Sequence, residues 1–155
     1  MLGQYLGFES SRPDKEQGTG PDVMWLIDGS VALCIEAKTE KDDSAHYRKA
    51  EVSQLSDHVQ WVQDNTSADS IVPILVGPLV PATRKANPGR DVLVIELSEF
   101  DALAQRLTSA LADAATKSLP LTLRSNLMDV FTARGLLWPD VFESMSKTPL
   151  RNLTT

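Results

Sequence analysis

Residues 20–38 read GPDVMWLIDGSVALCIEAK, with two apolar runs, 22–28 and 31–38, separated by a short polar break. The break contains Asp28-Gly29, a dipeptide that strongly favours a tight hairpin turn between two strands. The second run is apolar on both faces, which is typical of a central strand in a sheet. The sequence therefore predicts a β-hairpin whose two open ends come back together.

Charged residues gather at this open end. Asp22 begins the first strand, and Glu36-Ala37-Lys38 ends the second. Counting the register from the turn puts Asp22 opposite roughly Glu36 or Ala37. Because strand side chains alternate between faces, Glu36 and Lys38 point the same way and Ala37 points away. Carboxylates held close together repel unless a cation lies between them, so the pattern predicts a divalent-metal site with a lysine beside it.

A long helix is expected to follow, from about residue 44 to residue 65, with Ser44 as its N-cap. Its apolar stripe would face the sheet and comprises Val52, Leu55, Val59 and Val62. A second stripe, rotated by about a quarter turn, flanks this core face and comprises Tyr47, Glu51, Gln54, His58 and Trp61. Side chains of the second stripe can therefore reach the strand ends.

The remaining elements follow from apolar runs and from residues that start or stop helices. A short helix over 1–8 is expected to stop at Gly7, and residues 9–20 form a loop or begin with a short edge strand near Glu9. Pro73 favours an edge position or a bulge for the strand over 71–77. The other expected elements are a strand over 91–97, a helix over 98–117 capped by Ser98, a helix over 122–134 and a short helix over 139–145.

Composition narrows the class of protein. A chain of 155 residues is most simply one domain, and its abrupt ends are as typical of a domain cut from a longer chain as of a whole protein. The single cysteine, Cys34, lies in an apolar run, which indicates a buried thiol and a reducing compartment. No apolar span or signal pattern is present, so a cytoplasmic location is expected. The formal charge of −6 argues against nucleic-acid binding by a global positive field.

The motif Pro21-Asp22, followed after residues 23–35 by Glu36-Ala37-Lys38, resembles the signature of the PD-(D/E)XK nuclease superfamily. This superfamily includes restriction endonucleases, junction resolvases and nuclease domains attached to helicases. The likeness covers roughly residues 1–115, and Gln54 resembles a glutamine that many members carry on the helix after the motif.

The resemblance implies an α/β fold of the restriction-endonuclease-like class. In that fold a mixed β-sheet is flanked by helices, in an αβββαβ core, here with extra C-terminal helices. We expect a nuclease-like core over 1–118 and a C-terminal helical extension of the same domain over 119–155.

The implied activity is Mg²⁺-dependent endonuclease cleavage of DNA, with Mn²⁺ able to substitute. Asp22 and Glu36 would hold the ion, with the backbone carbonyl of Ala37 as a third ligand. Lys38 would orient the attacking water or stabilise the developing charge, and Gln54 would position either one. Many members add an acid on the first helix, but that helix here offers only Gln4. Glu9 and Glu16 lie beyond it, and Glu9 is the better candidate because it directly follows residues 6–8.

The implied partners are DNA and a helicase-like or other DNA-handling domain or subunit, with homodimerisation as a further expectation and no membrane contact. An alternative is a nuclease-like module that no longer cuts and serves in interaction or DNA binding. A third reading is a plain α/β scaffold in which the motif is fortuitous.

Simpler explanations exist for each residue. Asp22 could cap the loop after Gly20-Pro21, and Glu36 with Lys38 could form an ion pair at a strand end. Gln54 could be an ordinary solvated residue, with Glu51 serving in its place. Phosphates could contact basic residues of the loop over 78–90 or at the start of the long helix, namely Arg84, Lys85, Arg90, Arg48 and Lys49.

The two histidines, His46 and His58, are not spaced as a metal pair, and with one cysteine they do not indicate a zinc site. His58 is interpreted as solvated or partner-facing rather than as part of the site.

Overall fold

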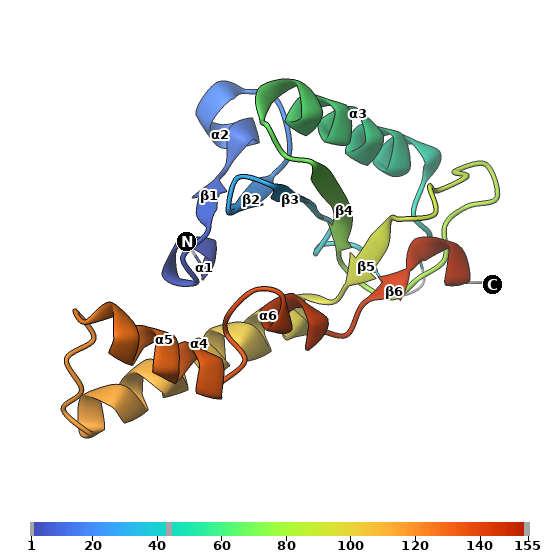
Figure 1. Ribbon diagram of the computed structural model, residues 1–155. Coiled ribbons are helices and arrows are strands. Elements are labelled where there is room, and N and C mark those ends of the chain that lie inside the picture. The colour runs from blue at the N-terminus through green and yellow to red at the C-terminus, as the bar shows by residue number, and fades with distance from the viewer. Residues whose placement is uncertain (1, 43–44, 154–155) are drawn as a thin grey trace. The chain divides into compact units, whose positions relative to one another are not determined.

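The computed structural model describes residues 2–42 and 45–153, which form an α/β fold with a six-stranded mixed sheet flanked by helices (Figure 1). The strands, in chain order and in sheet order, are β1 (Glu9–Ser11), β2 (Val23–Ile27), β3 (Val31–Ala37), β4 (Ser70–Val76), β5 (Leu93–Ile95) and β6 (Thr148–Pro149). The helices are α1 (Leu2–Tyr5), α2 (Pro13–Gln17), α3 (Lys49–Asn65), α4 (Leu97–Thr116), α5 (Arg124–Ala133) and α6 (Asp140–Glu143), with a 3₁₀ turn, η1 (Leu150–Asn152).

The sheet combines antiparallel and parallel pairs, as predicted. β3, β4 and β5 run parallel to one another, and the pairs β1–β2, β2–β3 and β5–β6 are antiparallel. Parallel neighbours need a crossover connection, and α3 supplies it between β3 and β4. Figure 1 shows α3 lying over one face of the sheet.

The hairpin forms where the sequence predicts it. Asp28 and Gly29 both adopt positive φ, 48° and 70°, and Ser30 N–H donates to the carbonyl of Ile27 at 3.1 Å. Only residues such as glycine, asparagine and aspartate enter this backbone region readily. The register pairs Val23 with Ile35. The next position outward therefore sets Asp22 opposite Glu36.

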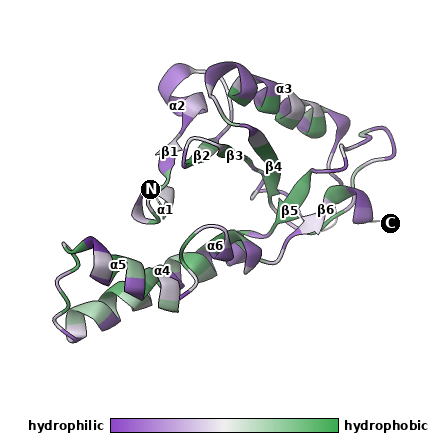
Figure 2. Ribbon diagram, in the orientation of Figure 1, coloured by the Kyte–Doolittle hydropathy of each residue, from purple (hydrophilic) through white to green (hydrophobic). Residues whose placement is uncertain are grey.

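An apolar core lies between α3 and the sheet. The predicted stripe is confirmed, because Val52, Leu55 and Val62 are buried and Val59 is partly buried. Figure 2 shows the hydrophobic side of α3 turned toward β4 and its polar side turned outward. Each such side chain contributes about 1.5–3 kcal/mol when buried, so this stripe fixes α3 on the sheet.

Cys34 belongs to the same core and is buried, as predicted. Burial raises the pKa of its thiol to about 12, and the nearby negative charge of Glu36 adds to the shift. The thiol therefore stays protonated and is a poor nucleophile.

The start predicted for the long helix is wrong. α3 begins at Lys49, and Ser44 lies outside the described residues. Tyr47 instead forms a parallel bridge with Ala82, donating its N–H to the carbonyl of Pro81 at 3.0 Å. Its hydroxyl donates to the carbonyl of Pro78 at 3.0 Å, and its ring is fully buried. These long-range contacts require extended backbone, so the helix cannot begin earlier.

The edge position predicted for residues 71–77 is also wrong, because β4 is a central strand paired with β3 and β5. β5 pairs with β4 only from Ile74 onward. Pro73 therefore lies just outside the part of β4 that pairs with β5, and its missing N–H costs that ladder nothing.

Three smaller differences concern element ends. The edge strand near Glu9 is confirmed as β1. The segment predicted as a loop contains α2, which starts with Pro13 and is followed by the C-cap Gly18, whose φ is 72°. Ser98 is not a cap, because α4 already begins at Leu97. The two-residue strand β6 was not predicted, since a segment of this length carries no periodic signal.

The chain divides into two compact units. One comprises the described parts of Met1–Leu97 and Lys147–Thr155, with the whole sheet, and the other comprises Ser98–Ser146. Residue 118 lies within the second unit, and the division into a core over 1–118 and an extension over 119–155 stays a prediction. Arg134 on the α5 side forms an ion pair with Asp113 of α4, which ties these two helices together.

None of the described helices has both the length and the apolar character needed to cross a membrane.

Candidate active site

Asp22 lies just before β2, at the point where the β2–β3 ladder ends. Its Oδ2 accepts a hydrogen bond from the backbone N–H of Ala37 at 2.8 Å. The side chain thus takes the place of a strand partner for this N–H. Asp22 therefore has a structural role at the end of β3, and this role brings its carboxylate next to the Glu36-Ala37-Lys38 segment.

Glu36 is fully buried and is the sole buried charged residue in the part of the chain that the structure describes. Its Oε2 lies 3.4 Å from Nζ of Lys38, and its Oε1 contacts Nδ1 of His58. An isolated carboxylate would be costly in such a place. The two basic side chains compensate for that cost, so this carboxylate is held in one orientation.

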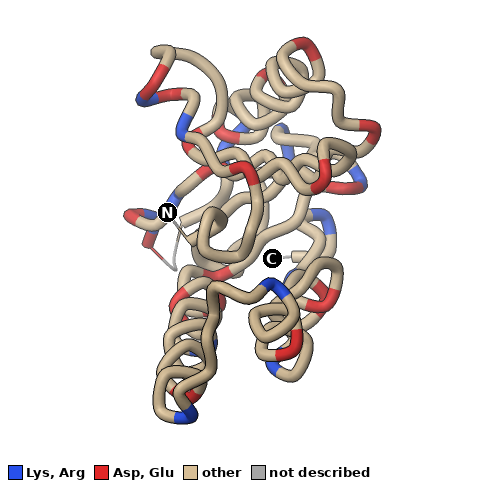
Figure 3. The backbone as a smooth tube through the Cα atoms, turned by 60° about the vertical axis from the view of Figure 1, so that its left-hand side comes forward, with Lys and Arg blue, Asp and Glu red and all other residues tan. Residues whose placement is uncertain are grey.

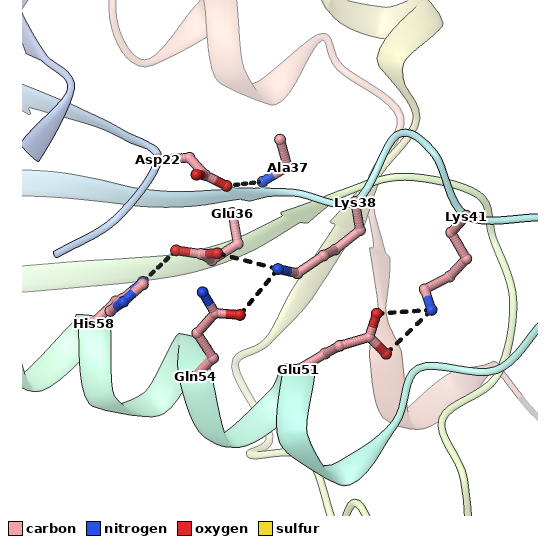
Figure 4. Close-up of polar contacts among 8 residues, drawn as sticks. All are labelled: Asp22, Glu36, Ala37, Lys38, Lys41, Glu51, Gln54 and His58. Carbon is pink, nitrogen blue, oxygen red and sulfur yellow. Dashed lines mark hydrogen bonds and ion pairs between the residues drawn. The ribbon is translucent and has the colours of Figure 1, made fainter. Parts of the chain in front are cut away.

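Lys38 joins β3 to α3. Its ammonium donates to Oε1 of Gln54 at 3.0 Å as well as contacting Glu36, and its side chain is 18% exposed. Figure 4 shows Glu36 and Lys38 both pointing toward α3 while Ala37 lies on the other side of the strand, as the alternation predicts. The structure therefore brings together Glu36, Lys38 and Gln54.

His58 is the residue that sequence reasoning missed. It follows Gln54 by four positions on α3, so both side chains leave the same face of the helix. α3 thus makes two polar contacts with the end of β3 and the residue after it (Figure 4). Gln54 binds Lys38, and His58 binds Glu36. The signal was present in the second stripe of the helix, but nothing in the sequence indicates which member of that stripe meets Glu36.

Glu9 is not brought to this group. It is exposed and pairs with Leu26 of β2, near the turn of the hairpin, whereas Asp22 is at the opposite end of that strand. Ala37 contacts Asp22 through its own backbone N–H, whereas the prediction gave a role to the Ala37 carbonyl as a metal ligand. Neither Glu9 nor the Ala37 carbonyl is thus shown in contact with the carboxylates.

An open cleft of about 570 Å³ lies beside Lys38, where β3 ends and α3 begins. Its lining residues are Ala37, Lys38, Thr39, Glu40, Lys41, Arg48, Ala50 and Glu51. Glu51 does not replace Gln54 as the partner of Lys38. Its Oε1 lies 2.8 Å from Nζ of Lys41, and its Oε2 accepts from the backbone N–H of Arg48 at 2.6 Å.

Comparisons with protein-family models, curated proteins and solved structures gave no match. What the site can do must therefore be judged from its own residues and their contacts.

The two acids at the open end of the hairpin carry the oxygen donors that a hard cation prefers. Asp22 and Glu36 are neighbours across the hairpin by the register, with the Asp22 carboxylate at the N–H of Ala37 and the Glu36 carboxylate turned toward α3 (Figure 4). Mg²⁺ typically binds one or two carboxylates and completes its shell with water and substrate oxygens. Residues 2–42 and 45–153 contain no group of three His, Cys, Asp or Glu arranged to hold a metal. Two carboxylates match the number of protein ligands that one such ion usually takes, whereas a two-metal site needs a larger set.

Glu51 gives the protein a measurable pH dependence. Burial alone would raise the pKa of its carboxyl, but hydrogen bonds from Lys41 and the Arg48 backbone, with nearby lysine charges, outweigh burial and hold the pKa below 4.5. Such a group stabilises the fold above its unfolded pKa and loses this contribution as the pH falls through its folded pKa. We expect Glu51→Gln to lower the free energy of unfolding by about 1 kcal/mol at pH 7.

Urea denaturation at several pH values checks this expectation. The gap between wild type and Glu51→Gln should shrink as the pH falls below about 4.5. Glu40→Gln is the matched control, because Glu40 lines the same cleft but is exposed. A gap that stays constant down to pH 3 would show that the ionised carboxylate of Glu51 is not what stabilises the fold.

Proposed function

We propose that this chain is a Mg²⁺-dependent DNA endonuclease domain of the PD-(D/E)XK, restriction-endonuclease-like class. The observation that carries the proposal is the buried Glu36 carboxylate in contact with Lys38, which Gln54 holds at 3.0 Å, with Asp22 opposite in the hairpin register. The order α1, β1, β2, β3, α3, β4 also agrees with the αβββαβ core of that class, with α2 as an addition.

The site residues have distinct parts in phosphodiester hydrolysis. Asp22 and Glu36 would hold the Mg²⁺ ion, which when bound lowers the pKa of a water and neutralises charge on a phosphate oxygen. Lys38 directs its ammonium at the attacking water or at the negative charge that develops on the phosphate. Gln54 keeps that ammonium aimed at the site.

DNA is the proposed substrate, with a helicase-like or other DNA-handling domain or subunit as a partner and homodimerisation as a route to cutting both strands. The chain carries 15 basic and 21 acidic residues, and Figure 3 shows both kinds interspersed along the backbone. Phosphate contacts in the absence of a large basic field supply little non-specific affinity. A partner that supplies DNA affinity is therefore part of the proposal, as is a cytoplasmic location, which the single buried cysteine supports.

A second candidate is a nuclease-like module that no longer cuts. Both oxygens of Glu36 already contact basic side chains, and Asp22 already accepts from Ala37. These contacts satisfy the carboxylates without a cation, which is the arrangement that a structural rather than catalytic site needs.

Two measurements separate the candidates. Supercoiled, linear and single-stranded DNA are incubated with the protein and Mg²⁺, Mn²⁺ or EDTA, and the nuclease should cut at least one form only with metal. Calorimetric titration with Mn²⁺ should show binding that Asp22→Ala weakens by at least about tenfold. Metal binding without cleavage of any form favours the non-cutting module, and absence of both contradicts the metal-dependent nuclease.

A further inference from the structure

The contact between His58 and Glu36 sets this site apart from one made of oxygen ligands alone. Glu36 is fully buried, while the His58 side chain is 19% exposed and reaches the carboxylate from α3. The other oxygen of Glu36 faces Lys38, whose ammonium has only donors and cannot bind a metal. The Oε1 side of the carboxylate is therefore where a second metal-binding atom lies, the imidazole Nδ1.

The packing of α3 on the sheet sets the position of His58. Leu55 and Val62 bury their side chains beneath α3 on either side of it, and Gln54 one turn earlier is bonded to Lys38. Because α3 is held at both points, the backbone of His58 stays beside Glu36, and only rotation of the His58 side chain can widen the gap between the imidazole and the carboxylate. A cation at Oε1 of Glu36 would thus meet this imidazole.

We infer that His58 is a metal ligand together with Glu36, and that the site takes a first-row transition ion such as Mn²⁺ in preference to Mg²⁺. An imidazole nitrogen is a good ligand for first-row transition ions, whereas Mg²⁺ selects oxygen donors. A cation shared by Oε1 and Nδ1 replaces their direct contact, and water or substrate oxygens complete its shell. This inference rests on the proposed metal-dependent function and assigns a residue that the nuclease motif does not contain.

The test uses Mn²⁺ as the probe because its unpaired electrons report directly on nitrogen ligands. Pulsed electron paramagnetic resonance of the full chain with bound Mn²⁺ should show modulation from a directly coordinated ¹⁴N. The chain has two histidines, so His46→Gln is the matched control. The backbone carbonyl of His46 accepts from Nζ of Lys41 at 3.2 Å, a contact that does not use the imidazole, so the variant should keep the nitrogen signal.

His58→Gln should lose the nitrogen signal and bind Mn²⁺ at least about tenfold more weakly in calorimetry, while its weaker affinity for Mg²⁺ changes less. If His58→Gln does not fold, His46→Gln decides the matter, because His58 carries the one imidazole left in that variant and an imidazole nitrogen signal that persists there comes from it.

The outcomes distinguish this inference from the proposed function. Bound Mn²⁺ without a nitrogen signal in the wild type, or a signal that survives in His58→Gln, overturns the role of His58 and leaves a metal site of oxygen ligands in place. Failure of Mn²⁺ to bind the wild type at all overturns both the inference and the metal-dependent nuclease. A nitrogen signal that is lost in His46→Gln but kept in His58→Gln would identify His46 as the ligand and would likewise overturn the inference.

Discussion

Lys38→Ala is expected to reduce metal-dependent DNA cleavage by about 10²–10³-fold or more while the chain stays folded. The ammonium of Lys38 contacts Glu36 and Gln54, and in the proposed nuclease it would stabilise the negative charge that develops on the phosphate. Its removal leaves one oxygen of Glu36 without a partner, which costs about 1–3 kcal/mol. A domain with a stability of about 5–15 kcal/mol tolerates that loss.

The measurement is the rate of conversion of supercoiled DNA with Mg²⁺ or Mn²⁺, with circular dichroism to confirm that the variant is folded. Lys15→Ala is the control, because Lys15 is an exposed lysine of α2 whose only recorded ion pair, with Asp14, lies on the surface at 3.8 Å. The control should cut at the wild-type rate. If Lys38→Ala does the same, Lys38 has no role in catalysis, and the assignment of the site is wrong.

Changes at Glu36 should have the largest effect on stability. Glu36→Ala removes a fully buried side chain and leaves Lys38 and His58 facing a void, so the free energy of unfolding should fall by about 3 kcal/mol. Glu36→Gln keeps the volume and one acceptor and should cost about half as much. Both variants should lose calorimetric binding of Mn²⁺, because the amide is a far weaker ligand than the carboxylate.

Urea denaturation measures the first effect and calorimetry the second. Glu40→Gln, at an exposed position four residues along, should stay within about 0.5 kcal/mol of the wild type. Since Glu36→Gln preserves the packing, metal binding at wild-type affinity in this variant would show that the carboxylate is not a ligand. An unchanged stability in Glu36→Ala would contradict the burial and pairing of the side chain.

The parts of the fold that follow from local sequence could be predicted. Asp28-Gly29 defines the hairpin through its own backbone preferences, and the apolar period of α3 defines its buried face. The start of α3 could not be predicted, because Tyr47 is held in extended backbone by residues more than thirty positions away. The position of the strand that contains Pro73 was predicted wrongly for a related reason. A proline is tolerated in this central strand because β5 begins to pair with it only at Ile74.

In the candidate site, too, only the features set by local sequence could be predicted. The juxtaposition of Asp22 with Glu36 and the shared face of Glu36 and Lys38 follow from strand alternation and register. Glu9 was assigned by analogy with an upstream acid, and the pairing of β1 with β2 sets it at the other end of the hairpin. The contact of His58 with Glu36 depends on the rotation of α3 over the sheet, which a helical period alone does not fix to within one side chain.

The pairing of β5 with β6 has a consequence for how the chain can vary. The unit Ser98–Ser146 leaves the sheet after β5 and returns at β6, and these strands pair through Leu93 with Pro149 and Val94 with Thr148. Its two ends are thereby held side by side, as in a closed loop. The entropic cost of closing such a loop, expressed as a free energy, rises only with the logarithm of the loop length, by about 0.6 kcal/mol for each doubling. Residues can therefore be gained or lost in the helical unit at little thermodynamic cost to the register of the sheet that carries Glu36 and Lys38.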